Sequence, residues 1–260
     1  MKEKKEIIST VEEKELNAPN GLAVGILSVL VYIAAAVGVI PAAMALDNGS
    51  TAFGAVLMTI CVLWLCVGWI PFMGVKVIRP NEALVLTLFG KYTGTLKKEG
   101  IFFVNPFSIA VNPASAQKIA SGKNPQEATA PVGKKLSLKA MTLDNKKQKI
   151  NDRDGNPIEI SIVVIWKIAN TAKAVFNVDN YEEYVSIQSD SALRDVAGAY
   201  PYDGDGENVK SLRGSSAEIA GHLRDMLQSR VDDAGIEVIE ARITHLAYAP
   251  EIAAAMLQRQ

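Results

Sequence analysis

The side chains that most often carry out chemistry are scarce in this chain. Histidine occurs only at His222 and His245, and cysteine only at Cys61 and Cys66. His222 lies at the edge of an apolar helical stripe, and His245 shares a predicted strand face with apolar residues, so we interpret both as hydrogen-bonded structural histidines. The two cysteines lie five apart inside an apolar segment, which suits neither a disulfide nor a metal site. We interpret them as small hydrophobic residues or as a palmitoylation target.

Acidic residues alternate with glycine from Asp203 through Asp205 to Glu207, which raises the possibility of a calcium loop. An EF-hand loop needs glutamate at its twelfth position, where this sequence has Gly214. We therefore predict an acidic turn. No serine lies in a nucleophile elbow, and the spacing of a phosphate-binding loop is missing. The sequence thus predicts no catalytic residue, no cofactor and no metal site, and we expect that the protein is not an enzyme.

Two long segments without any charged residue dominate the first third of the chain. They are Leu22–Leu46, with 25 residues, and Ala52–Val75, with 24. As helices they would reach about 37 and 36 Å, which is enough to cross a hydrocarbon core of about 30 Å. The pattern excludes both a purely soluble protein and a multi-span transporter. It predicts a transmembrane helical hairpin over residues 22–75, with helices at 22–46 and 52–75.

The charges that flank this hairpin predict its orientation. The connector from Asp47 to Thr51 contains no Lys or Arg, whereas lysines precede the first helix and follow the second. The positive-inside rule places the N-terminal segment, residues 1–21, and the later domain in the cytoplasm, at the cell (inner) membrane. Trp69 and Phe72 are predicted to lie at the membrane interface. Pro41 and Pro71 leave open a re-entrant hairpin that does not cross the bilayer.

Beyond the hairpin, strand patterns come first and helical patterns later. Alternating apolar residues predict a strand from Ile158 to Ile168, and a second long strand is expected from Ile236 to Tyr248. Asp179 with Glu182, and Ser215 with Glu218, resemble capping boxes that open two helices. Shorter strands precede these elements, and residues 110–133 have the composition of a loop. This order predicts an α+β fold with antiparallel strands and packed helices.

Several short motifs, in a fixed order, resemble those of one family. They are Ile78-Arg79-Pro80-Asn81-Glu82, Leu88-Phe89-Gly90-Lys91-Tyr92-Thr93-Gly94, Val104-Asn105-Pro106-Phe107, Asp154-Gly155-Asn156-Pro157-Ile158-Glu159-Ile160, Ala174-Val175-Phe176-Asn177-Val178-Asp179, Tyr200-Pro201-Tyr202-Asp203 and Ala241-Arg242-Ile243-Thr244-His245-Leu246-Ala247-Tyr248-Ala249-Pro250-Glu251-Ile252. Together they resemble the SPFH (band 7) superfamily of stomatins, prohibitins and flotillins, and the second half is most similar to bacterial stomatin-like, slipin-type members. The resemblance implies an SPFH domain at 76–249, followed by the start of a C-terminal helix at 250–260.

The resemblance also implies a function that needs no catalysis. We expect a membrane-anchored scaffold that forms a homo-oligomer, ring-like in form, and organises membrane proteins or lipid microdomains. A regulatory subunit that modulates a membrane AAA protease or a channel is the alternative. The expected partners are further copies of the chain, membrane lipids and one such protease or channel.

The charge is divided unevenly along the soluble part. Residues 76–150 carry a net charge of +9 and residues 151–260 a net charge of −8. Nucleic-acid binding is disfavoured for a basic region tethered at a membrane, whereas an anionic leaflet nearby accounts for it. Solvated loop lysines are the alternative. We predict a head-to-tail contact between copies, with the following contact residues: Lys146, Lys147, Lys149, Asp203, Asp205, Glu207, Ile252 and Met256.

A short apolar segment close to the hairpin completes the predicted interface. Phe102, Phe103 and Phe107 are more apolar than a surface hairpin needs. We predict that this segment touches or enters the inner leaflet. Packing of Phe102 or Phe103 in the protein core is the alternative.

Overall fold

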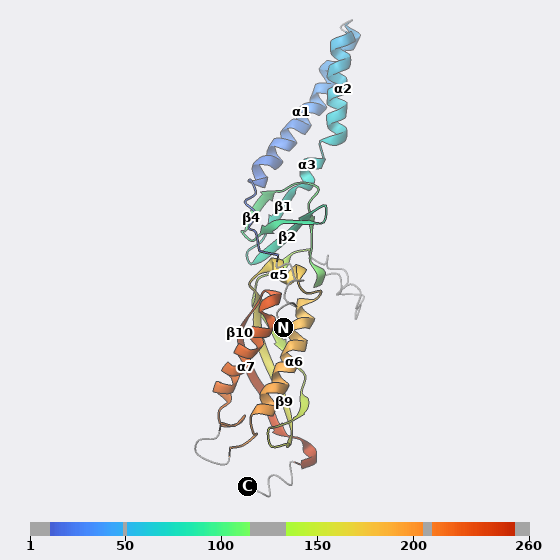
Figure 1. The fold of residues 1–260 in the computed structure, drawn as a ribbon. Helices are drawn as coiled ribbons and strands as arrows, with labels where there is room; N and C mark the ends of the chain where they lie inside the picture. Colours follow the sequence, from blue (N-terminus) through green and yellow to red (C-terminus); the bar gives the residue numbers. More distant parts are fainter. Residues whose placement is uncertain (1–10, 49–50, 115–133, 205–209, 253–260) are drawn as a thin grey trace. The chain divides into compact units, whose positions relative to one another are not determined.

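The structure is a computed structural model that describes residues 11–48, 51–114, 134–204 and 210–252. Its contacts divide the chain into two compact units (Figure 1). The N-terminal unit is Lys14–Val111, and the C-terminal unit comprises Met1–Glu13 with Asn112–Gln260. The N-terminal unit therefore holds the apolar hairpin together with the first strands of the soluble part. The predicted domain bounds, which separate these two parts, remain a prediction.

Two apolar helices pack against each other at the start of the N-terminal unit. Helix α1 is Gly21–Asp47 and helix α2 is Thr51–Val67. The Tyr32 hydroxyl donates to the Leu65 carbonyl at 3.3 Å, and Gly38 lies against the Cys61 sulfur. These contacts make the pair antiparallel, as Figure 1 shows. The two apolar helices thus form the hairpin that the sequence predicted.

The second apolar run does not form one helix as far as Val75. Helix α2 ends at Val67, and a short helix α3, Ile70–Met73, follows. Pro71 lies in the first turn of α3, where its missing N–H and fixed φ are tolerated. Strand β1, Val75–Ile78, then begins directly. The expected continuous helix over 52–75 is therefore corrected to two helices and a strand residue.

The strands of the N-terminal unit enclose a small core. Strand β1 pairs antiparallel with β4, Gly100–Phe103, while β2, Glu82–Leu88, pairs with β3, Lys91–Leu96, and with the short β5, Ile109–Ala110. Leu16 and Ala18 of the segment before α1 pack on this core. The Leu16 N–H donates to the Thr95 carbonyl at 3.0 Å, so this extended segment continues the strand pairing. The core consists of Ile78, Leu84, Leu86, Leu96 and Val104.

The C-terminal unit is built on an antiparallel sheet in the order β10-β9-β7. Strand β9 is Pro157–Ile168, β10 is Ile236–Tyr248, and β7 is Met141–Asp144, while β8, Gln148–Asn151, also pairs with β9. The short β6, Leu136–Ser137, precedes them. One face of β9 is buried throughout, as its alternation predicted: Ile158, Ile160, Ile162, Val164, Trp166 and Ile168.

In the part of the chain that the structure describes, this sheet is accompanied by the helices α5, Thr171–Phe176, α6, Tyr181–Ala199, and α7, Ser216–Val231, which is followed by the 3-10 turn η1, Asp232–Ala234. Apolar residues at helical spacing are buried on both long helices, with Val185 and Val196 on α6 and Leu223 on α7. Antiparallel strands with packed helices, preceded by two apolar helices, confirm the predicted α+β fold class.

The predicted capping boxes are wrong in detail. Helix α6 is capped by Asn180, not Asp179, because the Asn180 side chain accepts from the N–H groups of Glu182 and Glu183. Ser215 does occupy the N-cap position of α7, but its side chain makes no capping bond. The cap of α6 is therefore shifted by one residue, and α7 starts at the predicted residue without the predicted side-chain bond.

Strand β10 does not keep one face along its whole length. Its pairing with β9 shifts register between Val238 and Glu240 and again between Ile243 and His245. Each shift is a β-bulge that turns the following side chains to the other face. As a result Ile239 is 42% exposed, although strict alternation would place it with Ala241, which is buried.

Candidate membrane interface

The hairpin presents an apolar surface that water would solvate poorly. The two apolar segments, Gly21–Asp47 and Ala52–Met73, have mean hydropathies of 2.6 and 2.3 and are long enough to cross a membrane. Large apolar side chains such as Leu27, Phe53 and Leu63 are more than 60% exposed along them. Continuous exposed apolar surface of this kind fits a hydrocarbon environment. The two helices thus support the membrane anchoring that the sequence suggested.

The predicted interfacial aromatics lie where the second apolar segment ends. Trp69 follows the end of α2 and is 54% exposed, and Phe72 on α3 is also exposed. The Trp69 indole N–H donates to the Cys66 carbonyl at 2.9 Å, so the polar end of the ring is satisfied. An exposed ring with a bonded N–H suits the boundary between hydrocarbon and headgroups.

The three phenylalanines after β3 are not equivalent. Phe102 is half-buried and packs on the core of the N-terminal unit. Phe103 is also half-buried, with its ring against Gly74 at the end of α3. Phe107 is 61% exposed. Of the three, Phe107 offers the most surface to lipid, and membrane contact by any of them remains a prediction.

Two further apolar residues accompany Phe107 in the structure. Phe89 is 86% exposed and Ile109 is 60% exposed. Thr87 of β2 pairs with Ile109 of β5. Because the strands run antiparallel, Phe89 and Phe107 each lie two residues beyond that pair at the same end of the sheet. We call Phe89, Phe107 and Ile109 the phenylalanine patch.

Phe89 and Ile109 were not among the predicted membrane-interface residues. Phe89 follows the apolar run of β2, and apolar residues at the end of such a run are usually buried. In the structure Phe89 has φ +49° in the turn before Gly90, and that turn points its ring away from the core. The Phe-Gly pair after an apolar strand was the only signal available.

The predicted oligomer contacts lie mostly on the surface of the C-terminal unit. Lys146 and Lys147 are exposed between β7 and β8. Lys149 forms an ion pair with Glu251 of its own chain, and this bond raises the pKa of Lys149 and lowers that of Glu251. Asp203 pairs with Arg213.

The acidic and basic groups of that prediction lie near one another in a single copy. Asp152, which follows β8, accepts a hydrogen bond from the Tyr202 N–H at 3.0 Å, so Asp203 and Lys149 belong to the same end of the C-terminal unit. This proximity gives no support to a head-to-tail contact between them. Ile252 is half-buried, whereas Asp205, Glu207 and Met256 lie outside the described residues. The contact prediction therefore stays untested.

The two histidines differ in their surroundings. His222 is exposed, and its Nδ1 lies 3.3 Å from the Tyr200 hydroxyl. His245 is half-buried on β10. Among the residues that the structure describes, no three His, Cys, Asp or Glu side chains group as metal ligands.

Comparison with known proteins assigns this architecture to a family. The model of the "SPFH domain / Band 7 family" matches residues 76–260. The chain belongs to the SPFH domain / Band 7 family. The match starts at Lys76, directly after the hairpin, and spans all the strands from β2 onward.

Curated relatives of this SPFH protein agree with the family. Stomatin of Mus musculus is 21% identical over 195 residues, which cover 75% of this chain and 56% of stomatin. An uncharacterized protein of Methanothermobacter thermautotrophicus is 23% identical over 201 residues, which cover 77% of this chain and 53% of that protein. The chain spans about half the length of these relatives.

Proposed function

We propose that this SPFH protein is a membrane-anchored scaffold that self-associates and organises membrane proteins or lipids by contact rather than by catalysis. The observation that carries the proposal is the direct connection between anchor and domain. The hairpin helices and strands β1 to β5 form one compact unit. A domain held this close to its anchor can act along the membrane plane.

The surface of the N-terminal unit supports a role at the bilayer. The phenylalanine patch exposes three large apolar side chains on the unit that carries the hairpin. Exposed apolar clusters on a soluble surface mark interaction sites. Anchoring also holds copies at one height and so raises their effective concentration, which favours self-association.

Extraction of the full chain in its native lipids tests the proposal. We expect a homo-oligomer of defined size in imaging and in native mass measurement, without another protein in fixed proportion. A monomer at all membrane densities would overturn the proposal. A membrane protease or channel present in stoichiometric amount would instead make the chain a regulatory subunit.

A further inference from the structure

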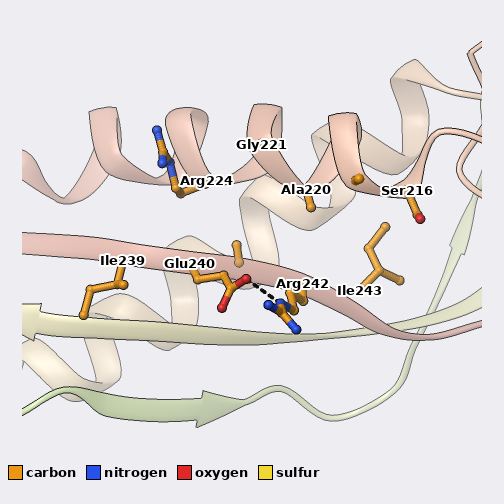
Figure 2. A pocket seen from close by; sticks show the side chains of 10 residues that line it. Ser216, Ala220, Gly221, Arg224, Ile239, Glu240, Arg242 and Ile243 are labelled. Atoms are coloured by element: carbon orange, nitrogen blue, oxygen red, sulfur yellow. Dashed lines mark hydrogen bonds and ion pairs between the residues drawn. The ribbon is translucent and has the colours of Figure 1, made fainter.

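A groove runs along the outer edge of strand β10, beside helix α7. Its volume is about 580 Å³. Figure 2 shows α7 on one side and β10 on the other, and the helix contributes the small residues Ala220 and Gly221 together with Ser216 and Arg224. The strand contributes five consecutive residues, Ile239–Ile243. Since consecutive residues point to opposite faces, a groove that touches all five follows the edge of the strand.

Among the residues that the structure describes, the edge of β10 at this groove has no strand partner. Within the described residues, β10 pairs only with β9. The two bulges of β10 fall at either end of the groove, between Val238 and Glu240 and between Ile243 and His245. The stretch between them is regular, so its unpaired backbone groups can accept another strand.

The opposite edge of the same sheet belongs to β7. In the part of the chain that the structure describes, β7 also pairs only with β9. Met141 and Leu143 of β7 are half-buried, while Thr142 and Asp144 are exposed. As far as the described residues go, the sheet therefore has two open strand edges on a single copy.

Strands β7 and β10 are in matching register because both pair with the same residues of β9. Val164 pairs with Ala241 of β10 and with Leu143 of β7. Directly paired residues share a face of the sheet, and Val164 is fully buried on its face. Leu143 and Ala241 thus both lie on the buried face. A copy displaced sideways along the sheet would place its Leu143 beside Ala241, next to the small residues of α7.

The charges on the other face also match. Val163 pairs with Arg242 of β10 and with Asp144 of β7. After the same sideways displacement, Asp144 of the neighbouring copy would stand beside Arg242. The Arg242 Nε donates to Glu240 in its own chain (Figure 2). Its guanidinium has four further N–H donors for a second carboxylate.

We propose that the β10 groove of one copy receives the β7 edge of the next, so that the sheets of neighbouring SPFH domains continue into one another. The contact is head-to-tail and parallel, because β7 and β10 both run antiparallel to β9. Such contacts close into rings when the rotation between copies permits. The inference rests on the proposed self-association and specifies its surface.

Cysteine cross-linking in the full chain tests the proposed contact. The variant carries Leu143→Cys and Ala241→Cys, with Cys61 and Cys66 changed to Ala. Within one chain β9 separates the two positions by about 9.6 Å, twice the strand spacing, which exceeds the reach of a disulfide, about 7 Å. We expect a ladder of dimers, trimers and larger species after oxidation in native membranes. Each single cysteine variant should give no ladder.

The outcomes separate this contact from the proposed function. No ladder from an assembly that keeps its normal size would overturn the β7–β10 contact and leave the scaffold proposal intact. If the unmodified chain itself forms no assembly, the scaffold proposal is overturned.

Charge reversal provides a second, independent test. Asp144→Arg and Arg242→Asp should each weaken self-association by about tenfold, by placing like charges across the contact. Co-expression of the two single variants should restore assembly, since the arginine introduced in one variant then faces the aspartate introduced in the other. The unchanged Asp144 and Arg242 of the two variants also face each other in such a mixed assembly. Each chain in the mixture still carries two like charges at positions 144 and 242. If the reversals weakened assembly through repulsion within one copy, co-expression would therefore not restore it. Absence of rescue would contradict the contact.

Filling the groove gives the third test, with a matched control. A Cβ added to Gly221 on α7 meets no atom within 4 Å, and the same holds for Gly198 on α6. Only Gly221 lines the groove. Gly221→Leu should therefore reduce the assembly by about tenfold or more, while Gly198→Leu should leave its size unchanged. Equal effects of the two variants would argue against the groove as the contact.

Discussion

At the scale of single residues, Phe89 departs furthest from what its neighbours predict. It combines a left-handed backbone, φ +49°, with a ring that is 86% exposed. A left-handed conformation is costly for a bulky side chain. Backbone strain of this kind is found mostly at functional sites. A lipid surface would give the exposed ring a favourable environment that water does not. We therefore predict that Phe89 and its neighbours in the phenylalanine patch contact the membrane in addition to the hairpin helices.

Fluorophore labelling tests the patch in the full chain. We expect a dye at Phe89→Cys or Phe107→Cys, in a chain with Cys61 and Cys66 changed to Ala, to be quenched by brominated lipids in vesicles. The same dye at Lys98→Cys serves as the control. Lys98 is exposed beyond the far end of β3, about 20 Å away by strand length. Equal quenching at all three positions, or none at any, would contradict a membrane contact specific to the patch.

Tyr181 predicts how stability depends on alkaline pH. Burial raises the pKa of its phenol to about 12. Because this value lies above that of an unfolded tyrosine, about 10, the unfolded chain loses its proton first. The contribution of the neutral phenol to stability is therefore complete below pH 10 and is lost as the pH rises from 10 to 12.

The variant Tyr181→Phe isolates this effect. Between pH 9 and 12 the unfolding free energy of the wild type should fall by about 2–3 kcal/mol more than that of the variant. Urea titrations of both proteins in detergent at these two pH values measure the difference. Parallel pH profiles would show that the Tyr181 phenol does not titrate abnormally.

At the scale of elements, helix α6 shows how a single cap fixes a start. The Asn180 side chain accepts from the N–H groups of Glu182 at 3.0 Å and Glu183 at 3.3 Å. Asn180→Ala should lower the unfolding free energy by about 1 kcal/mol, because two helix N–H groups lose their acceptor. Asp179→Ala, one residue earlier, is the matched control and should cost only a few tenths of a kcal/mol by a charge effect at the helix start. Chemical denaturation compares them, and a larger loss for Asp179→Ala would restore the capping box that the sequence suggested.

The elements that could be predicted are those whose period repeats over many residues. The six alternating apolar residues of β9 and the stripe on α7 suffice, because burial of one face is the dominant free-energy term. Strands β1 and β7 could not be found in this way, since four residues contain too little alternation. The bulges of β10 were also beyond reach. A bulge is a mismatch in length between two strands, and the sequence of one strand does not contain it.

The same reasoning separates the parts of the candidate interface. Trp69 and Phe72 follow from the sequence because they end an apolar run, where interfacial aromatic residues are expected, and their contact with the membrane interface stays a prediction. The exposure of Phe89 depends on a turn, and its closeness to Phe107 depends on the pairing of Thr87 with Ile109. The open edges of β7 and β10 likewise follow only from strand order. Contacts between distant parts of the chain therefore marked the limit of prediction.

At the scale of the whole molecule, the anchor and the domain are not separable at Lys76. The extended segment before α1 places Leu16 and Ala18 on the core that Ile78 and Leu96 also build. A chain that starts at Lys76 would lose this cover and expose part of the core. We expect such a chain to unfold at a lower denaturant concentration than one in which residues 11–20 are joined to Lys76 by a flexible linker in place of the hairpin. Equal midpoints would show that the segment contributes nothing to the stability of the unit.

The orientation of the hairpin is the remaining property that belongs to the molecule as a whole. The connector between the two helices contains no Lys or Arg, and the positive-inside rule therefore places it outside the cell. Asn48 at this connector and Asp225 on α7 are both exposed, so a cysteine at either position can react. In a chain without Cys61 and Cys66, a reagent that does not cross membranes should label Asn48→Cys in intact cells, and Asp225→Cys only after the cells are opened. Protection of both positions in intact cells would indicate a re-entrant hairpin, with the domain still inside. The proposed orientation rests on the lysines of the two flanks, which should hold both flanks on the cytoplasmic side. Labelling of Asp225→Cys in intact cells would place the domain outside and so overturn this orientation.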